Sequence, residues 1–372
     1  MKEILSEILK ENRFEMIKKL GEGGFGLTFQ VKRNNKNYAA KIIKYNIIEK
    51  EIEADIIKEF RGPNIVKVNT VLKKIVGNNI YYAIIMEEAP LKNLRIFITH
   101  MKNDNILDLI YQSPFEIISD NLIKFFSSQL IQGLEILNRN NFCHFDIKPD
   151  NILVFFGFYV KLADFGLLRD IETITIDDYN NRDKNNNNVK KIRVPGGTMG
   201  YFSPEFYQNK GKVLLENAFK HDYFSLGATI YYIKYGKKMI DLDYHMIKDD
   251  FMISNTIVEL IEKRIDQIRM DKSSDKDFVD FLCSLIQYKP EERPNLELLL
   301  ANKWLNKDKE ELENIIEINN FDEKKLLMEI NKSDFLIKKG KYLEPIFRKK
   351  NDKNKNRKNK FVFKKNKGTF IL

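Results

Sequence analysis

The sequence predicts an α+β fold with two lobes, a small β-rich lobe followed by a larger α-helical lobe. Residues 14–45 alternate between apolar and polar side chains around a glycine-rich turn, which is typical of strands. In residues 120–138, apolar side chains instead recur at helical spacing. The order of these two patterns places the junction between the lobes near residues 87–91.

The β-rich lobe is predicted to contain five strands and one helix. The first three strands are FEMIKKL, LTFQVKR and NYAAKII, with GEGGFG after the first and a turn at Asn34-Asn35 after the second. An amphipathic helix is expected around residues 47–60 and is stopped by Pro63. Two further strands, IVKVNTVLKKI and NIYYAIIMEE, complete a small sheet by about residue 88.

The second lobe is predicted to be helical. Residues 222–236 are apolar nearly all round, so we expect a buried helix that ends at Gly236. Residues 255–268 and 275–287 also have helical patterns. One apolar face of the helix over 120–138 carries Leu122, Ile123, Phe126, Leu130, Ile131, Leu134 and Leu137.

The positive charge of the chain is concentrated in a tail. The net charge is +10, and residues 348–367 contain 11 Lys or Arg and one Asp, which leaves 52 basic and 52 acidic residues elsewhere. We expect residues 348–372 to be disordered and residues 306–347 to form a charged, partly helical extension. The tail fits three interpretations: a Lys/Asn composition bias, a nuclear-import, nucleic-acid or acidic-partner patch, or an anionic-membrane patch.

No segment predicts a membrane span or a secretory signal. There is no apolar run near 18 residues, and the start, MKEILSEILKENRF, mixes charges throughout. The expected location is therefore intracellular, either cytoplasmic or nuclear. Residues 178–192 are polar and Asn-rich, and we expect them to be mobile.

The segment HFDIKPDN, followed by Asp164-Phe165-Gly166, is the strongest functional signal. Transfer of a phosphoryl group to a hydroxyl needs positioned groups that neutralise spread negative charge. Asp146 is a candidate proton acceptor, and Lys148 is placed to offset charge on the phosphoryl group. Asn151 and Asp164 carry the hard oxygen ligands that Mg²⁺ prefers.

The glycine-rich turn is a candidate phosphate-binding loop. Glycines allow backbone N–H groups to approach phosphate oxygens, although such turns also close ordinary hairpins. The loop lacks the Gly-Lys-Ser/Thr of a Walker motif and lies between two strands, which excludes the strand-to-helix dinucleotide fingerprint. The loop residues are Gly21, Glu22, Gly23, Gly24, Phe25 and Gly26.

Lys41 is the candidate cation for the nucleotide phosphates. It lies in an apolar strand fifteen residues beyond the loop, and a cation in a half-buried strand needs a carboxylate partner. Glu53 on the following predicted helix is the chosen partner, and Glu51 is the alternative. The two glutamates lie about 200° apart around a helix, so both cannot face the lysine.

Together these motifs make residues 14–305 resemble a eukaryotic-type protein kinase domain. The resemblance implies a bilobal kinase-like fold with an N-lobe over about 14–88, a C-lobe over about 91–305 and an N-terminal extension over 1–13. It also implies ATP as substrate, Mg²⁺ as cofactor and proteins as phosphoryl acceptors. In that family, Asp146 would be the catalytic base and Lys41 would pair with Glu53. Positions that match the family's nucleotide contacts are Gly21, Gly23, Gly26, Ala39, the gatekeeper Met86, the hinge residues Glu87 and Ala89, and Leu153.

Later motifs resemble the same family. Thr198 is the residue type seen there in serine/threonine kinases, where it bonds the catalytic Asp and Lys, and this disfavours a tyrosine or dual-specificity enzyme. The resemblance implies a buried ion pair between Glu205 and Arg293. It further implies bonds from Asp222 to the catalytic-loop backbone, an aromatic core residue at Phe224 and a final helix at Trp304.

Two departures from the family pattern affect the expectations. Thr28 replaces the usual Val above adenine, which we expect to cost ATP affinity about 1 kcal/mol at most. Phe145 replaces the common Arg that binds a phosphorylated activation segment. We therefore expect the unphosphorylated protein to be active, although Thr173, Thr175 and Tyr179 are available in the segment.

The predicted function is a serine/threonine protein kinase that transfers the ATP γ-phosphoryl group with Mg²⁺. A pseudokinase or scaffold is the main alternative, but it is expected to lack Lys41, Asp146, Asn151 or Asp164, and all four are present. A nucleic-acid-binding protein is supported by the tail alone. Asp150 is a candidate contact for a basic residue of the substrate.

Overall fold

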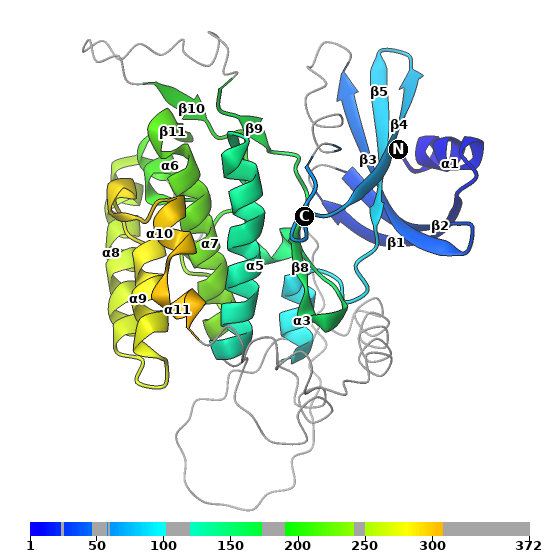
Figure 1. Ribbon diagram of the computed structural model, residues 1–372. Helices are drawn as coiled ribbons and strands as arrows, with labels where there is room; N and C mark the ends of the chain where they lie inside the picture. The colour runs from blue at the N-terminus through cyan, green and yellow to red at the C-terminus, as the bar shows by residue number, and fades with distance from the viewer. Residues whose placement is uncertain are drawn as a thin grey trace, which may run out of the picture.

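The computed structural model describes residues 1–23, 26–46, 58, 60–101, 120–172, 190–241 and 250–307. These residues form a β-rich lobe beside a helical lobe, as predicted (Figure 1). The helix expected over 47–60, the extension over 306–347 and the tail lie outside the described residues, apart from residues 58, 60, 306 and 307.

The first lobe is a five-stranded antiparallel sheet with the order β1-β2-β3-β5-β4. Asn34 and Asn35 join β2 to β3 with φ of 51° and 60°, the left-handed pair that a tight hairpin turn requires, as the sequence predicted. The strands are β1 (Glu15–Gly23), β2 (Gly26–Arg33), β3 (Lys36–Asn46), β4 (Val68–Val76) and β5 (Asn79–Glu87).

The two faces of β3 serve different parts of the molecule. Ala40 and Ile42 lie in an apolar cluster with residues of β2 and β5. Side chains alternate along a strand, so Lys41 and Ile43 face the other way, and Ile43 joins the core cluster of the helical lobe.

A helix that the sequence analysis did not predict covers the outer face of the sheet. Helix α1 (Lys2–Glu11) buries Leu5, Ile8 and Leu9 completely in the same cluster as Ala40 and Ile42. It lies on the side of the sheet away from the helical lobe (Figure 1). Residues 1–13 are therefore packed against the β-rich lobe.

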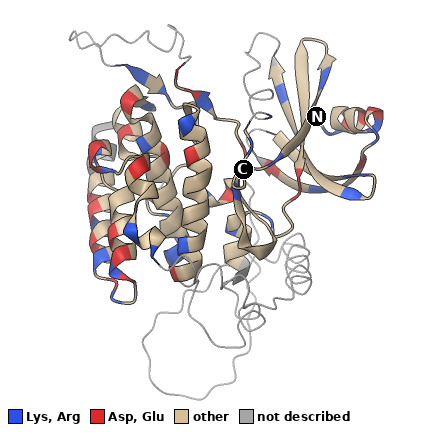
Figure 2. Ribbon diagram, in the orientation of Figure 1, with Lys and Arg blue, Asp and Glu red and all other residues tan. Residues whose placement is uncertain are grey.

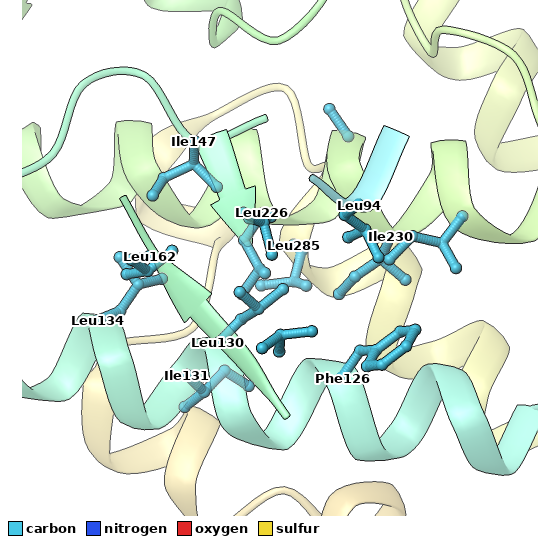
Figure 3. Packing of buried hydrophobic residues seen from close by; sticks show 14 of the residues in the cluster. Leu94, Phe126, Leu130, Ile131, Leu134, Ile147, Leu162, Leu226, Ile230 and Leu285 are labelled. Atoms are coloured by element: carbon cyan, nitrogen blue, oxygen red, sulfur yellow. The ribbon is translucent and has the colours of Figure 1, made fainter. Parts of the chain in front are cut away.

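The helical lobe is organised around one buried helix, α7 (Ala218–Tyr235), which ends at Gly236 in the left-handed conformation, as expected. A Cβ at Gly227 would lie 2.7 Å from the side chain of Ile286, so this glycine allows α7 and α9 to approach closely. Figure 3 shows leucines and isoleucines from α5, α7 and the strands between them meeting in one core. The other long helices are α5 (Asp120–Arg139), α8 (Asp250–Arg269) and α9 (Lys276–Leu285).

Short elements complete the second lobe. Three two-stranded sheets pair β6 with β9, β7 with β8 and β10 with β11. Strand β10 (Lys191–Arg193) includes two residues of the segment expected to be mobile, so that expectation was wrong for Lys191 and Ile192. The remaining elements are α3 (Leu94–Met101), β6 (Phe142–Cys143), η1 (Pro149–Asn151), β7 (Ile152–Val154), η2 (Phe156–Phe158), β8 (Val160–Leu162), β9 (Arg169–Asp170), α6 (Pro204–Gln208), β11 (Lys212–Leu214), η4 (Leu215–Asn217), η6 (Pro290–Glu292), α10 (Leu296–Leu300) and α11 (Lys303–Asn306).

A buried ion pair fixes α6 to the segment after α9. Arg293 Nη1 and Nη2 donate to Glu205 Oε1 and Oε2 over 2.8 and 2.7 Å, which confirms the predicted pair. The Arg293 guanidinium also lies 5.0 Å from the ring centre of Phe224. Elsewhere, acidic and basic residues are interspersed along α8 and α9 (Figure 2).

Candidate active site

The predicted catalytic loop, which lies between β6 and η1, is held by one carboxylate of α7. Asp222, fully buried in α7, accepts hydrogen bonds from the backbone N–H groups of His144 and Phe145 over 2.7 and 2.9 Å, as predicted. Burial raises the pKa of Asp222 to about 7, although both amides oppose this shift. His144 is also buried, and its Nε2 lies 3.1 Å from the carbonyl oxygen of Ala163.

The carboxylate of Asp146 is held on both oxygens. Oδ2 accepts from Lys148 Nζ and from Asn151 Nδ2, each over 2.7 Å. Oδ1 accepts from Thr198 Oγ1 over 3.3 Å, and the same hydroxyl oxygen accepts from Lys148 Nζ over 2.6 Å. These bonds fix the carboxylate's orientation and join the loop to the segment before α6.

Asp164 and Lys41 connect the two lobes. Lys41 Nζ contacts Asp164 Oδ1, and the pairing of β3 with β5 places Lys41 opposite Ile84. Burial by itself would raise the pKa of Asp164, but the adjacent Lys41 ammonium outweighs it and lowers that pKa below its usual value. Asp164 is therefore an anion, paired with Lys41 of the other lobe.

The donor set fits a hard divalent cation such as Mg²⁺. The nitrogen of the Asn151 side chain donates to Asp146 Oδ2 and to the Asp146 carbonyl oxygen, which leaves the Asn151 amide oxygen as an acceptor. Asp164 contributes an ionised carboxylate. Neutral amide oxygen and carboxylate are ligands that Mg²⁺ accepts.

The glycine-rich loop shows two different reasons for glycine. A Cβ at Gly26 would lie 2.0 Å from the carbonyl oxygen of Ile42, so the sheet itself requires this glycine. At Gly21 no atom of the described residues lies within 4 Å of an added Cβ, so space beside the backbone is open there. Gly24 and Phe25 lie outside the described residues, as do Glu53 and Glu51.

The predicted hinge follows β5 at the junction of the lobes. Met86 pairs with Ala39 of β3, and Glu87 accepts from Lys161 Nζ and from the backbone amide of Lys67, each over 2.7 Å. The side chain of Glu87 thus has a structural role that the sequence analysis did not predict.

The hinge chain is attached to the strand beneath it. Leu91 N–H donates to the carbonyl of Val154 over 3.2 Å, and Val154 N–H donates to that of Lys92 over 2.8 Å. Leu153, the residue before Val154 in β7, forms a bridge with Asn93. Ala89 and Leu153 therefore lie on neighbouring segments, as the nucleotide-contact prediction requires.

One charged residue near the loop was missed by the sequence analysis. Arg95 in α3 donates to both carboxylate oxygens of Asp150. The sequence analysis had instead named Asp150 as a candidate contact for a basic residue of the substrate. No local pattern marks this pair, because its members are 55 positions apart.

The sequence matches the protein kinase domain family over residues 14–305, which is most of the chain. The chain belongs to the protein kinase family. This kinase domain is 30% identical over 247 residues to a probable serine/threonine-protein kinase from Dictyostelium discoideum. The matched region covers 63% of the chain and 45% of that relative. The chain is 26% identical over 317 residues to an Aurora kinase from Saccharomyces cerevisiae, covering 81% of the chain and 71% of that relative.

The kinase domain's curated relatives are often longer than the matching region. A serine/threonine-protein kinase, cot-1, from Neurospora crassa is 26% identical and is matched over 40% of its own length. The chain thus spans less than half the length of several curated relatives. No helix in the described part of the kinase is both long and apolar enough to cross a membrane.

Phe145 is one of the two residues at which this kinase domain departs from the expected family pattern. Its side chain is 1% exposed and lies in an apolar cluster with residues of the activation segment and of β11. Its backbone φ is 61°, an uncommon conformation for a residue with a bulky side chain. The cluster consists of Cys143, Phe145, Leu167, Ile192, Val194, Phe202, Val213 and Ala218.

Proposed function

We propose that this chain is an active, Mg²⁺-dependent serine/threonine protein kinase. The observation that carries the proposal is the Asp146 carboxylate, held by Lys148, Asn151 and Thr198. A carboxylate fixed in this way is oriented for the proton of an approaching hydroxyl group before any substrate binds.

The proposed reaction transfers the γ-phosphoryl group of ATP to a Ser or Thr hydroxyl. The hydroxyl oxygen forms a bond to the γ-phosphorus, the bond from that phosphorus to the bridging oxygen breaks, and ADP leaves. Asp146 accepts the hydroxyl proton, and Lys148 and Lys41 neutralise charge on the transferred group and the remaining phosphates. Asn151 and Asp164 would hold Mg²⁺, which supplies additional charge neutralisation when bound.

The nucleotide is proposed to lie between the lobes. Gly21, Gly23 and Gly26 would cover the phosphates, while Ala39, Met86, Leu153 and the backbone of Glu87 and Ala89 would contact adenine. Family membership and the position of these residues around the junction of the lobes support the assignment.

The test is labelling of a peptide library with Mg²⁺ and ATP by the wild type, by Asp164→Asn and by Asp266→Asn. Asp266 is an exposed residue of α8 and serves as a matched carboxylate control. We expect the wild type and the control to label Ser and Thr positions and Asp164→Asn to lose labelling. Equal background labelling by wild type and Asp164→Asn would favour the pseudokinase, and labelled Tyr would favour dual specificity.

We also propose that activity does not require phosphorylation of the activation segment. A phosphate-binding Arg is replaced by Phe145, and apolar packing of Phe145 with Ile192 and Val194 would hold these two residues beside the loop without a phosphate. Thr173, Thr175 and Tyr179 lie outside the described residues. Phosphatase treatment should leave the rate of transfer unchanged, and loss of activity would refute this proposal.

A further inference from the structure

Arg95 is an unusual residue for the place it occupies. It lies in the first turn of α3, which begins after Asn93, whose side-chain oxygen accepts from the amide of Ile96 over 2.9 Å. A cation is disfavoured at the N-terminus of a helix, because the helix dipole is positive there. Its neighbour Leu94 is fully buried in the core, and this anchors the turn beside the catalytic loop.

The guanidinium of Arg95 is held on several sides. Nε donates to both oxygens of Asp150 over 2.8 Å, and Nη2 lies 2.6 Å from Asp150 Oδ2. Nη2 also donates to the hydroxyl of Tyr201 over 3.3 Å, and the ring centre of Tyr232 lies 4.9 Å from the guanidinium carbon. Planar, two-point pairing with a carboxylate is the strongest geometry that arginine offers.

Asp150 lies beside the proposed acceptor position. It precedes Asn151, whose side chain bonds Asp146. Tyr201, the other partner of Arg95, donates its backbone N–H to the carbonyl of Thr198, and Thr198 bonds Asp146 as well. A peptide whose hydroxyl approaches Asp146 therefore passes close to the Arg95–Asp150 pair.

We propose that Arg95, by pairing with the Asp150 carboxylate, prevents this carboxylate from binding a basic residue of the substrate. This inference rests on the proposed kinase function. The arginine makes this kinase indifferent to a basic residue at the substrate position nearest Asp150. A substrate guanidinium would have to displace one that is already bonded to both carboxylate oxygens and supported by two tyrosines.

Removal of Arg95 is expected to uncover the carboxylate. The Asp150 side chain is 36% exposed with Arg95 in place, so it borders solvent and a peptide can reach it. An ion pair of this exposure is expected to change peptide selection about fivefold.

The experiment uses fluorescent peptides with one Ser acceptor in an alanine background. Arg or Gln is placed in turn at each neighbouring position. The proteins are the wild type, Arg95→Gln, Asp150→Asn and the double variant. The control is Lys303→Gln, which removes an exposed cation of α11 that pairs with Asp277 of α9. Two ratios of Arg to Gln peptide are measured: the dissociation constant with Mg²⁺ and ADP, and kcat/KM with Mg²⁺ and ATP.

The wild type and Lys303→Gln should show ratios near one, and Asp150→Asn should not change them. Arg95→Gln should raise selection of Arg about fivefold at one position, mainly through KM, and the double variant should restore indifference. A wild type that already selects Arg and loses this selection in Asp150→Asn overturns the proposal, as does an unchanged ratio in Arg95→Gln.

Two safeguards keep the result decisive. If Arg95→Gln unfolds, Asp150→Asn in the wild-type background still shows whether Asp150 contributes to selection. If the wild type transfers phosphate to no peptide, the proposed function fails, while the binding ratios still decide the role of Arg95.

Discussion

The two halves of the candidate active site are assembled in different ways. The acceptor half, around Asp146, is held within one lobe by Asp222, Asn151 and Thr198. The nucleotide half depends on a contact between lobes, in which Lys41 of β3 reaches Asp164. The difference suggests that disturbing the first half affects both chemistry and folding, whereas disturbing the second affects chemistry alone.

The largest effect is expected from Asp146→Asn. Asparagine keeps the size of the side chain but cannot accept the hydroxyl proton, so kcat should fall about a thousandfold. The KM for ATP should change little, because Asp146 belongs to the acceptor half. Initial-rate measurements with a labelled Ser peptide test this, and a fall of less than tenfold would contradict the assigned role.

Asp222→Ala should be the most destabilising change of those considered. It leaves the buried amides of His144 and Phe145 without an acceptor, which should cost about 2 to 4 kcal/mol of unfolding free energy. Urea denaturation measures this loss, with Asp266→Ala on α8 as the matched surface control. Equal stability of both variants would show that the acceptor half is not anchored through Asp222.

Acid should weaken the acceptor half through His221. Burial lowers the pKa of His221 to about 4 from 6.5, and its Nε2 has no hydrogen-bond partner among the described residues. The folded state therefore binds fewer protons than the unfolded state between these values. Neutral His221 therefore contributes about 3 kcal/mol to the free energy of unfolding above pH 6.5, and this contribution is lost as pH falls toward 4.

The measurement is the pH dependence of urea unfolding for the wild type and His221→Gln. His144 and Asp222 titrate in both proteins: burial lowers the pKa of His144, whereas burial raises that of Asp222 to about 7, which opposes the loss of stability in acid. The stability of the wild type relative to His221→Gln should therefore fall as pH is lowered from 6.5 to 4. Parallel curves would show that His221 does not titrate in this range.

Lys41→Met should separate chemistry from folding in the nucleotide half. Transfer is expected to fall about a hundredfold, because one phosphate-neutralising charge is lost. Unfolding free energy should change by no more than about 1 kcal/mol, because Asp164 keeps a 28% exposed side chain that water can solvate. Lys44→Met, at an exposed position of the same strand, is the control, and a large stability loss specific to Lys41→Met would refute the contrast.

The sequence predicted the elements whose signal is local. The alternation of β2 and β3, the turn at Asn34 and Asn35, and the long helices all arise from residues close together in the chain. The pairing of Glu205 with Arg293 is not local, and it was predicted only because both residues lie in recognisable motifs.

The missed features have three physical causes. Arg95 and Asp150 are brought together by the fold, and no spacing in the sequence reveals the pair. Helix α1 did have a local signal, since Leu5, Ile8 and Leu9 lie three and four positions apart, but the charges between them hid it. Strands as short as β10 and β11 have three residues each, too few for a periodic pattern.

Helix α1 has a practical consequence for any shortened form of this protein. The family match begins at residue 14, just beyond the helix, so a protein trimmed to that boundary would lose the side chains that cover Ala40 and Ile42. The uncovered sheet would present an apolar face to water, and such faces promote self-association. The trimmed protein should therefore be prone to aggregation during purification even if its catalytic loop is intact.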